Sequence, residues 1–294
     1  MRERFEYIAI KIVLWCASWM PKSFIYLMTK SLAMLFYYLL PKRRVLVQKN
    51  LSNAFPNLPQ ETIDRYTKEV YTNISESVAE ILLMYVDRFD IDGAIVNLDE
   101  ALEKLKGCKS QNGTIFMAAH FSNWELGAHF LGLHGFPTLV IGRKGDNELI
   151  DKYITVPFRN KYGNSAVYKD NAMIAMAKRL KSDGSVGVLI DQKTGGTHSA
   201  KVDFFGRKAP TTLSVASLKL KFDSAVVPMS VIRESRGRYR MFIEDPIEYK
   251  ADEIDDQRGK LEAMTLHYNK VLEGMILRSP TEWFWVHNRW NIKR

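Results

Sequence analysis

The sequence contains little cysteine and no grouped metal ligands. Its two cysteines, Cys16 and Cys108, form neither a CxxC motif nor a disulfide framework. The six histidines are scattered without the paired spacing that a zinc site uses. We therefore expect a protein of a reducing compartment that binds no metal.

A clean apolar run of membrane-spanning length is also absent, although the first forty residues come close. Two apolar stretches, residues 7–20 and 24–40, are each shorter than the ~20 apolar residues that spanning requires. They are rich in aromatic residues and carry lysines, as suits the headgroup region of a bilayer, and the basic run 42–44 follows. A cleaved signal peptide and a buried soluble helix are the alternatives. Acidic residues near the start and the lack of a small-residue cleavage site disfavour the signal peptide. We predict a membrane-anchoring helical segment over residues 1–41, followed by one domain over 42–294.

The formal charge of +9 indicates an anionic partner. Charge alone does not choose among nucleic acid, an acidic protein, a phosphorylated substrate and anionic lipid. The sequence has no zinc-finger spacing and no RNA-recognition motif. We therefore expect no nucleic-acid partner.

The hydrophobic pattern predicts an α/β fold. Residues 52–58 are typical of a connector, and residues 59–86 have the spacing of a long amphipathic helix. Short apolar runs, typical of buried strands, then alternate with helical patterns, which predicts a layered sheet flanked by helices. The expected strands are residues 114–119, 137–142, 185–190, 225–232 and 239–243. The expected helices are residues 121–133, 171–181, 211–221 and 256–278.

His120 follows the first of these strands directly, at the strand end where ligands gather in such sheets. A histidine can remove a proton from a hydroxyl near neutral pH, and the carboxylate of Glu125 is close enough in sequence to hold its other nitrogen. On one helix the two would lie about 140° apart, so they meet only if His120 is on the turn. Two alternatives stay open. His120 can be an ordinary strand-end histidine, and Ser122 with Glu125 also matches a helix capping box.

A second polar group, Asp191 and Gln192, follows the strand 185–190 in the same way. Asp191 can equally be a turn or capping residue. Arginines between the two groups, Arg143 and Arg159 among them, can bind phosphate or carboxylate through the planar guanidinium. The aromatic and basic segment 282–290 is either a docking edge at a membrane or ordinary packing against the sheet.

Taken in order along the chain, these segments resemble the lipid A biosynthesis acyltransferases, the late acyltransferases of the lysophospholipid acyltransferase superfamily. The resemblance covers nearly the whole length. It is carried by Arg43-Arg44, Asn50-Leu51, Ala54-Phe55-Pro56, AAHFSNWEL with His120 and Glu125, GRKGDN with Arg143, Asp151, Arg159, Lys169-Asp170, Asp191-Gln192, FFGRKAPTT, Val227-Pro228 and TEWFWVHNR.

The resemblance implies a glycerol-3-phosphate acyltransferase-like fold and a fatty acyl transfer without a cofactor. The donor would be an acyl-acyl carrier protein. The acceptor would be a hydroxyl of a lipid A precursor, an anionic glycolipid of lipopolysaccharide biosynthesis, at the cytoplasmic face of the bacterial inner membrane. His120 matches the catalytic base and Glu125 its acidic partner, in an HX4E version of the motif. Arg159 matches a substrate-binding arginine, and we expect Asp191, Gln192 and Arg143 to contribute to substrate binding.

Two other functions are compatible with the same residues. The acceptor could be another membrane glycolipid or a lysophospholipid. The chain could also be a non-catalytic membrane protein that binds anionic lipid, although such a protein would not need His120 with Glu125.

Overall fold

The computed structural model describes residues 1–292. Its α-helices are α1 (Arg2–Trp19), α2 (Lys22–Leu39), α3 (Pro41–Ala54), α4 (Gln60–Tyr85), α5 (Ile91–Ala94), α6 (Leu98–Lys106), α7 (Trp124–Leu133), α8 (Glu148–Ile150), α9 (Val156–Arg159), α10 (Ala172–Lys181), α11 (Ser214–Phe222) and α12 (Gln257–Arg278). Its strands are β1 (Thr114–Ala118), β2 (Thr138–Gly142), β3 (Ser165–Tyr168), β4 (Ser185–Leu189), β5 (Ser199–Phe204), β6 (Arg207–Thr212), β7 (Ala225–Ser235) and β8 (Arg238–Ile243).

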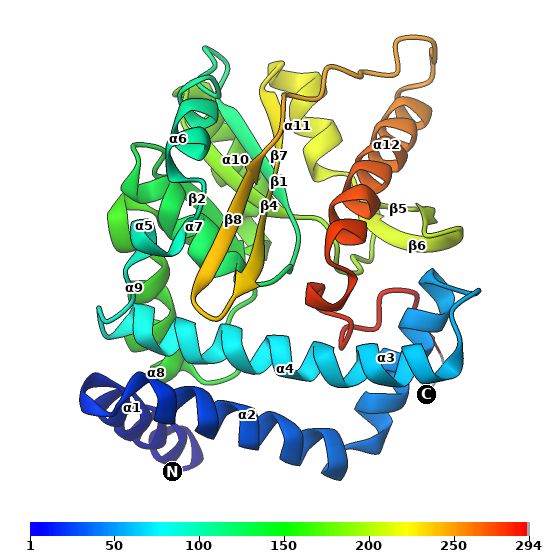
Figure 1. The fold of residues 1–294 in the computed structure, drawn as a ribbon. Helices are drawn as coiled ribbons and strands as arrows, with labels where there is room; N and C mark the ends of the chain where they lie inside the picture. Colours follow the sequence, from blue (N-terminus) through cyan, green and yellow to red (C-terminus); the bar gives the residue numbers. More distant parts are fainter. Residues whose placement is uncertain (293–294) are drawn as a thin grey trace.

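The centre of the fold is a six-stranded mixed sheet in the order β3-β2-β4-β1-β7-β8. Within this sheet β3, β2, β4, β1 and β7 are parallel to their neighbours, and β8 is antiparallel to β7. The carboxyl ends of the parallel strands therefore share one edge of the sheet. β5 and β6 form a separate hairpin that packs beside α12 (Figure 1).

Helices cover both faces of the sheet, because successive side chains along a strand point to opposite faces. On β1, Ile115 and Met117 contribute to a core with α10, α11 and α12, whereas Phe116 contributes to a second core with α6 and α7. Both cores are apolar, so the strands are buried on both faces, as the continuous apolar runs predicted. The α/β fold with a mixed sheet flanked by helices is confirmed.

Several segments differ from the expected pattern. α3 runs to Ala54, so the predicted connector 52–58 begins inside a helix. The predicted helix 211–221 begins later, at Ser214, because residues 211–212 end strand β6. Strand β3 was not predicted, since it is only four residues long and half-buried. Short or edge elements bury too little apolar surface to leave a clear period in the sequence.

The two consecutive N-terminal helices, α1 and α2, are called the N-terminal hairpin here. α2 packs along α4, whereas α1 contacts both α4 and α8 (Figure 1). Ala17, Ile25 and Tyr26 are buried there against Ala79 and Leu83 of α4. Within residues 1–292, no single helix is both long and apolar enough to cross a bilayer. Only α2 and α3 taken together meet those two criteria, and they are bent by 90° at their junction.

Candidate functional site

His120 and Asp191 meet at the carboxyl edge of the sheet. His120 follows β1 and Asp191 follows β4, and these two strands are parallel neighbours. Nδ1 of the His120 ring lies 2.8 Å from Oδ1 of Asp191, and the backbone amide of His120 donates to Oδ2 at 3.0 Å. One carboxylate therefore fixes both the ring and the backbone of His120.

The Asp191 carboxylate is almost completely buried, with 1% of the residue exposed. Burial alone would raise its pKa, but the charge of His120 and hydrogen bonds from His120 and from Nε1 of Trp283 (2.8 Å) outweigh burial and hold the pKa below its usual value. An ionised carboxylate only accepts hydrogen bonds, so the shared proton belongs to Nδ1 of His120. Nε2 then carries the free lone pair, and within residues 1–292 it has no hydrogen-bond partner.

The turn after His120 is held by the C-terminal segment. Ser122 has a positive φ of 50°, an uncommon conformation for a residue other than glycine. Its amide donates to the carbonyl of Glu282 at 2.8 Å, and the amide of Phe284 donates to the carbonyl of His120 at 3.0 Å. The rings of Trp124 and Phe284 lie 5.1 and 6.2 Å from the His120 ring. The segment 282–290, whose role the sequence left open, thus forms one wall of the site.

The predicted contact between His120 and Glu125 is wrong. Oε1 of Glu125 instead accepts from Nη2 (2.7 Å) and Nε (3.1 Å) of Arg159. Asn123, rather than Ser122, caps α7 by accepting from the amide of Leu126, so the capping box of Ser122 with Glu125, the alternative that the sequence left open, does not form either. With the helix beginning at Trp124, Glu125 lies in its first turn, and its nearest charged partner is on α9.

Arg159 lies at the same edge of the sheet. Gly142 ends β2, and a Cβ built on it would be 2.9 Å from Nη1 of Arg159, so any other residue there would push this guanidinium out of its position. Burial opposes the charge of Arg159, but Glu125 outweighs burial and raises the pKa of the guanidinium. The edge therefore carries two pairs, the hydrogen-bonded His120 and Asp191 and the ion pair of Glu125 with Arg159.

Two predicted substrate-binding residues, Arg143 and Gln192, lie near this edge without contacting His120 or Asp191 through their side chains. Arg143 follows β2, but its side chain is 76% exposed and pairs with Asp146, whose side chain is 88% exposed. Gln192 is half-buried next to Asp191, and its side chain forms no hydrogen bond to any described residue. Neither contributes to the pairing at His120.

Three residues of the C-terminal segment were not predicted as individual site residues. Trp283 binds Asp191, as described. His287 accepts a hydrogen bond from the amide of Lys193 at 3.1 Å, and burial lowers its pKa to about 4. Arg289 is fully buried and donates to Oγ1 of Thr211 at 2.6 Å, and burial lowers its pKa to about 10. The density of aromatic residues was the only signal in the sequence, and it does not distinguish a wall of the site from packing.

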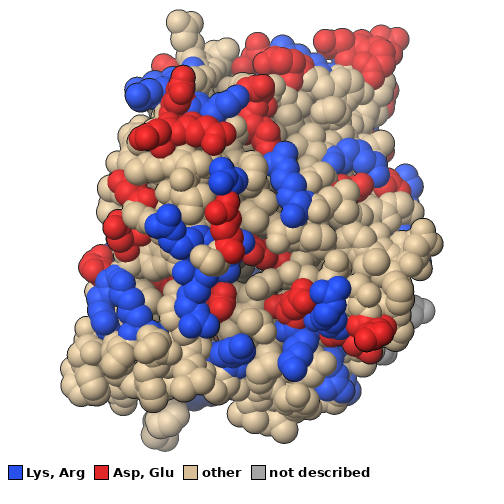
Figure 2. Space-filling view, viewed as in Figure 1, with Lys and Arg blue, Asp and Glu red and all other residues tan. Residues whose placement is uncertain are grey.

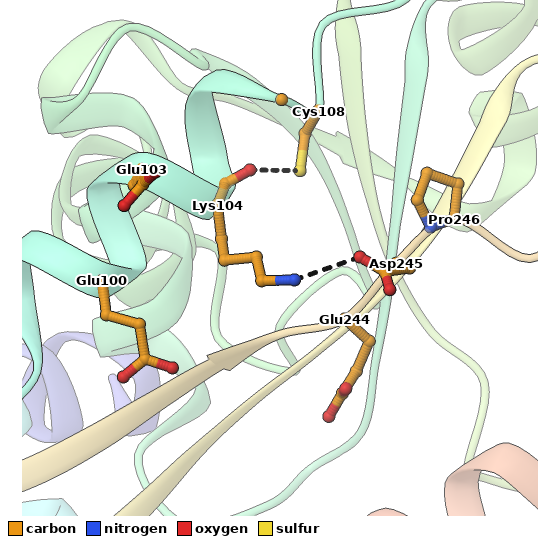
Figure 3. A pocket seen from close by; sticks show the side chains of 8 residues that line it. Glu100, Glu103, Lys104, Cys108, Glu244, Asp245 and Pro246 are labelled. Carbon is orange, nitrogen blue, oxygen red and sulfur yellow. Dashed lines mark hydrogen bonds and ion pairs between the residues drawn. The ribbon is translucent and has the colours of Figure 1, made fainter.

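A hollow of about 430 Å³ between α6 and the segment after β8 lies apart from this site (Figure 3). Its lining includes Glu100, Glu103, Glu244 and Asp245, and the last of these pairs with Lys104 at 3.1 Å. The chain leaves β8 at the amino edge of the parallel strands, opposite His120. None of the predicted site residues lines this hollow.

Comparison with known proteins gives one family. The model of the bacterial lipid A biosynthesis acyltransferase family matches residues 2–292. A lipid A biosynthesis acyltransferase of Haemophilus influenzae is 24% identical over 257 residues, which is 86% of this chain and 78% of the relative. The lipid A biosynthesis lauroyltransferase of Escherichia coli is 25% identical over 285 residues (96% and 90%). The palmitoleoyltransferase of the same organism is 24% identical over 265 residues (86% and 80%).

Proposed function

Since the chain belongs to the bacterial lipid A biosynthesis acyltransferases, which are acyl-transferring enzymes, we propose that it moves a fatty acyl chain onto a hydroxyl of a lipid A precursor with His120 as the general base. The observation that carries the proposal is the His120–Asp191 pair at the carboxyl edge of the sheet. It leaves Nε2 as a basic nitrogen in a partly exposed position.

The proposed reaction is a direct transfer from a thioester. Nε2 of His120 removes the proton of the acceptor hydroxyl as its oxygen attacks the thioester carbonyl carbon. The tetrahedral intermediate then collapses, the C–S bond breaks, and the thiolate receives the proton from the imidazolium. Asp191 keeps the ring in its Nδ1–H tautomer and stabilises the positive charge that forms on it.

The developing oxyanion needs a hydrogen-bond donor. The amides of Phe121 and Ser122, directly after His120, already donate to Ala119 and Glu282. We therefore place the donor at the N-terminus of α7, where the first amides of a helix are free to bind an anion. The amide of Leu126 is already used by the Asn123 cap, which leaves those before it.

Glu125 has a positioning role in this proposal. It holds Arg159 at the end of β2, and that guanidinium can bind a carbonyl or phosphate oxygen of a substrate. Arg143 and Gln192 remain proposed substrate contacts that form only when substrate is bound. Glu125 and His120 of the HX4E motif thus act on different parts of the same edge.

We further propose an acyl-acyl carrier protein as the donor and the cytoplasmic face of the inner membrane as the place of reaction. The charge of +9 favours both an acidic carrier protein and an anionic membrane surface. The outer side of the N-terminal hairpin exposes large apolar side chains, among them Phe5, Trp15, Trp19, Phe24, Leu27 and Leu32. Figure 2 shows that the lower edge of the molecule, formed by α1 and α2, has few charged side chains in this view.

These side chains support an interfacial anchor over residues 1–41 and a catalytic domain over 42–294. The inner side of the hairpin is already used, because Ile25 and Tyr26 are buried against α4 and Arg88 donates to the carbonyls of Ala17 and Met20 at 2.7 Å. A helix that spanned the bilayer would lose those contacts. We therefore propose that α1 and α2 lie in the plane of the interface. Sedimentation of the protein with anionic vesicles should fail when Trp15, Trp19 and Leu27 are replaced by Ser.

The proposed reaction is tested with purified protein, acyl-acyl carrier protein and a lipid A precursor. Transfer should give a lipid heavier by one acyl chain in the mass spectrum, and His120→Ala should abolish it without changing the thermal unfolding midpoint. If the protein acylates a lysophospholipid and leaves the lipid A precursor unchanged, the proposed acceptor is wrong and the lysophospholipid replaces it. Wild-type rates from His120→Ala would contradict the mechanism.

A further inference from the structure

A groove of about 730 Å³ opens beside the His120 site, between the N-terminal helices and the C-terminal segment. Phe36 and Leu40, at the end of α2, lie on one side, and Phe284 lies on another. Phe284 also contacts the catalytic site, because its ring lies 6.2 Å from that of His120. The groove is therefore lined on one side by a residue that packs against the His120 ring.

Two cations line the groove without a carboxylate to balance them. Arg43 comes from α3, and Lys193 follows Asp191 by two residues. Neither side chain forms an ion pair with any described residue, and Nζ of Lys193 donates only to Oδ1 of Asn291, at 3.1 Å. No aspartate or glutamate is among the residues that line the groove in the described part of the chain. The groove therefore has a net positive charge close to His120.

The hydroxyl of Tyr71 adds an unused donor. Tyr71 lines the groove, is 93% buried with 7% exposed, and its hydroxyl has no hydrogen-bond partner within residues 1–292. Buried hydroxyls are normally paired, so an orphan of this kind calls for a partner that the protein itself does not supply. Burial raises the pKa of Tyr71, which keeps the hydroxyl protonated and able to donate.

The groove is continuous with the apolar outer surface of the hairpin. Phe36 and Leu40 are each 46% exposed and belong both to that surface and to the groove. The same groove also presents Arg43 and Lys193, and it includes Phe284, whose ring packs against His120. Apolar and cationic side chains side by side in one groove fit a ligand that has alkyl chains and an anionic headgroup.

We propose that this groove binds the phosphate-bearing headgroup of the acceptor lipid. Arg43, Lys193 and the hydroxyl of Tyr71 contact the phosphate, while Phe36 and Leu40 contact the start of an alkyl chain. The inference rests on the proposed function, since it places the acceptor hydroxyl at Nε2 of His120. It assigns the groove to the acceptor and leaves the donor to approach from another side.

The test compares two acceptors, a phosphorylated lipid A precursor and the same lipid after phosphatase treatment. The variant Arg43→Gln/Lys193→Gln should raise the KM for the phosphorylated lipid by about tenfold for each cation removed, because a charge-assisted contact contributes that much. Its KM for the dephosphorylated lipid and for the donor should stay at the wild-type values. Lys193→Arg should keep the wild-type KM.

A matched control removes two exposed cations at the opposite edge of the sheet. Lys106 and Lys181 end the helices that precede β1 and β4, and Lys106→Gln/Lys181→Gln lowers the net charge by the same amount. This control should leave every KM unchanged. An unchanged KM for the phosphorylated lipid in the groove variant, an equal rise for both lipids, or a rise for the donor instead would each overturn the proposal.

A binding measurement separates this inference from the proposed function. His120→Ala protein in detergent micelles is titrated with the phosphorylated lipid and followed by tryptophan fluorescence. The two groove substitutions together should raise the Kd for this lipid about a hundredfold, which is about tenfold for each cation removed. If the wild type acylates neither lipid, the proposed function is wrong. This titration alone then shows whether the groove binds the phosphorylated lipid. If the double variant does not fold, Lys193→Gln alone is used.

Discussion

The carboxylate of Asp191 holds both the ring and the backbone amide of His120, at 2.8 and 3.0 Å, from a position 71 residues further along the chain. Trp283 binds the same carboxylate from the C-terminal segment. Three distant parts of the sequence therefore determine the orientation of one imidazole. Glu125, the acidic residue nearest to His120 in sequence, contacts Arg159 instead.

This relationship predicts that Asp191, more than Glu125, supports the general base. Asp191→Asn removes the charge and allows the wrong ring tautomer, and kcat should fall by about 10²–10⁴-fold. Glu125→Gln keeps a hydrogen-bond acceptor for Arg159, so it should mainly raise KM and lower kcat by less than about tenfold. Steady-state kinetics of both variants with the same donor and acceptor check this. The reverse order of the two losses would restore Glu125 as the partner of His120.

The sheet could be predicted because its strands are buried on both faces. β1, β2, β4 and β7 appear as short apolar runs between helical patterns, and each was predicted to within a few residues. The position of His120 at a strand end followed from the same pattern. Strand β3 and the β5–β6 hairpin bury little continuous apolar surface, so no comparable apolar run marks them in the sequence.

The partner of His120 could not be predicted from local spacing. His120 and Glu125 are five positions apart, and whether they meet depends on which residue caps α7. Asn123 and Ser122 are both good capping residues, so sequence alone does not choose. The His120–Asp191 contact depends on the order of strands, which places β4 beside β1. Non-local pairing of this kind is a property of the topology.

A buried carboxylate, that of Glu80, joins the N-terminal hairpin to the rest of the protein, and its removal should destabilise the fold. Glu80 is fully buried and accepts from Tyr26 (3.1 Å), the amide of Gly237 (3.1 Å), Arg233 and Tyr239. Glu80→Ala removes the nearest carboxylate from the buried Arg233, which keeps only Glu76 at 3.4 Å and Ser77 at 2.9 Å, and the free energy of unfolding should fall by about 3–5 kcal/mol. Equilibrium unfolding of both proteins in urea measures this loss in the free energy of unfolding.

The control for Glu80 is on the exposed side of the same helix. Glu69 pairs with Arg65 at 3.2 Å in an exposed i, i+4 arrangement. Glu69→Ala should change the free energy of unfolding by less than about 0.5 kcal/mol. Equal losses from the two substitutions would mean that the buried network does not hold the hairpin in place.

Stability should fall as the pH is lowered from about 6.5 to about 4 because of His287. Burial lowers the pKa of His287 from 6.5 to about 4, so in this range the unfolded chain binds a proton that the folded chain does not. The free energy of unfolding therefore rises with pH in this range, by up to about 3 kcal/mol and by less to the extent that solvent screens this partly exposed ring. His287→Gln should flatten this part of the pH profile, whereas substitution of the exposed His198 should not. An identical slope in wild type and His287→Gln would disprove the assignment.

The two cysteines should differ sharply in reactivity. Cys108 is 4% exposed, its thiol donates to the carbonyl of Lys104 at 3.3 Å, and burial raises its pKa to about 11. At pH 8 only about one thiol in a thousand is then ionised, and the thiolate is the reactive form. Iodoacetamide should label the more accessible Cys16 in the folded protein, and both cysteines after denaturation. Peptide mass spectrometry gives the result, and rapid labelling of Cys108 in the folded state would argue against its burial.

The position of Trp283 and Phe284 in the chain has a consequence for biosynthesis. A chain is made from its N-terminus, so the apolar hairpin leaves the ribosome long before residues 282–289 exist. Until then Asp191 lacks its indole donor and the His120 turn lacks the segment that holds it. A chain that ends at Ser279 should therefore bind vesicles and transfer no acyl chain. Synthesis itself would then ensure that the enzyme reaches the membrane before it can act.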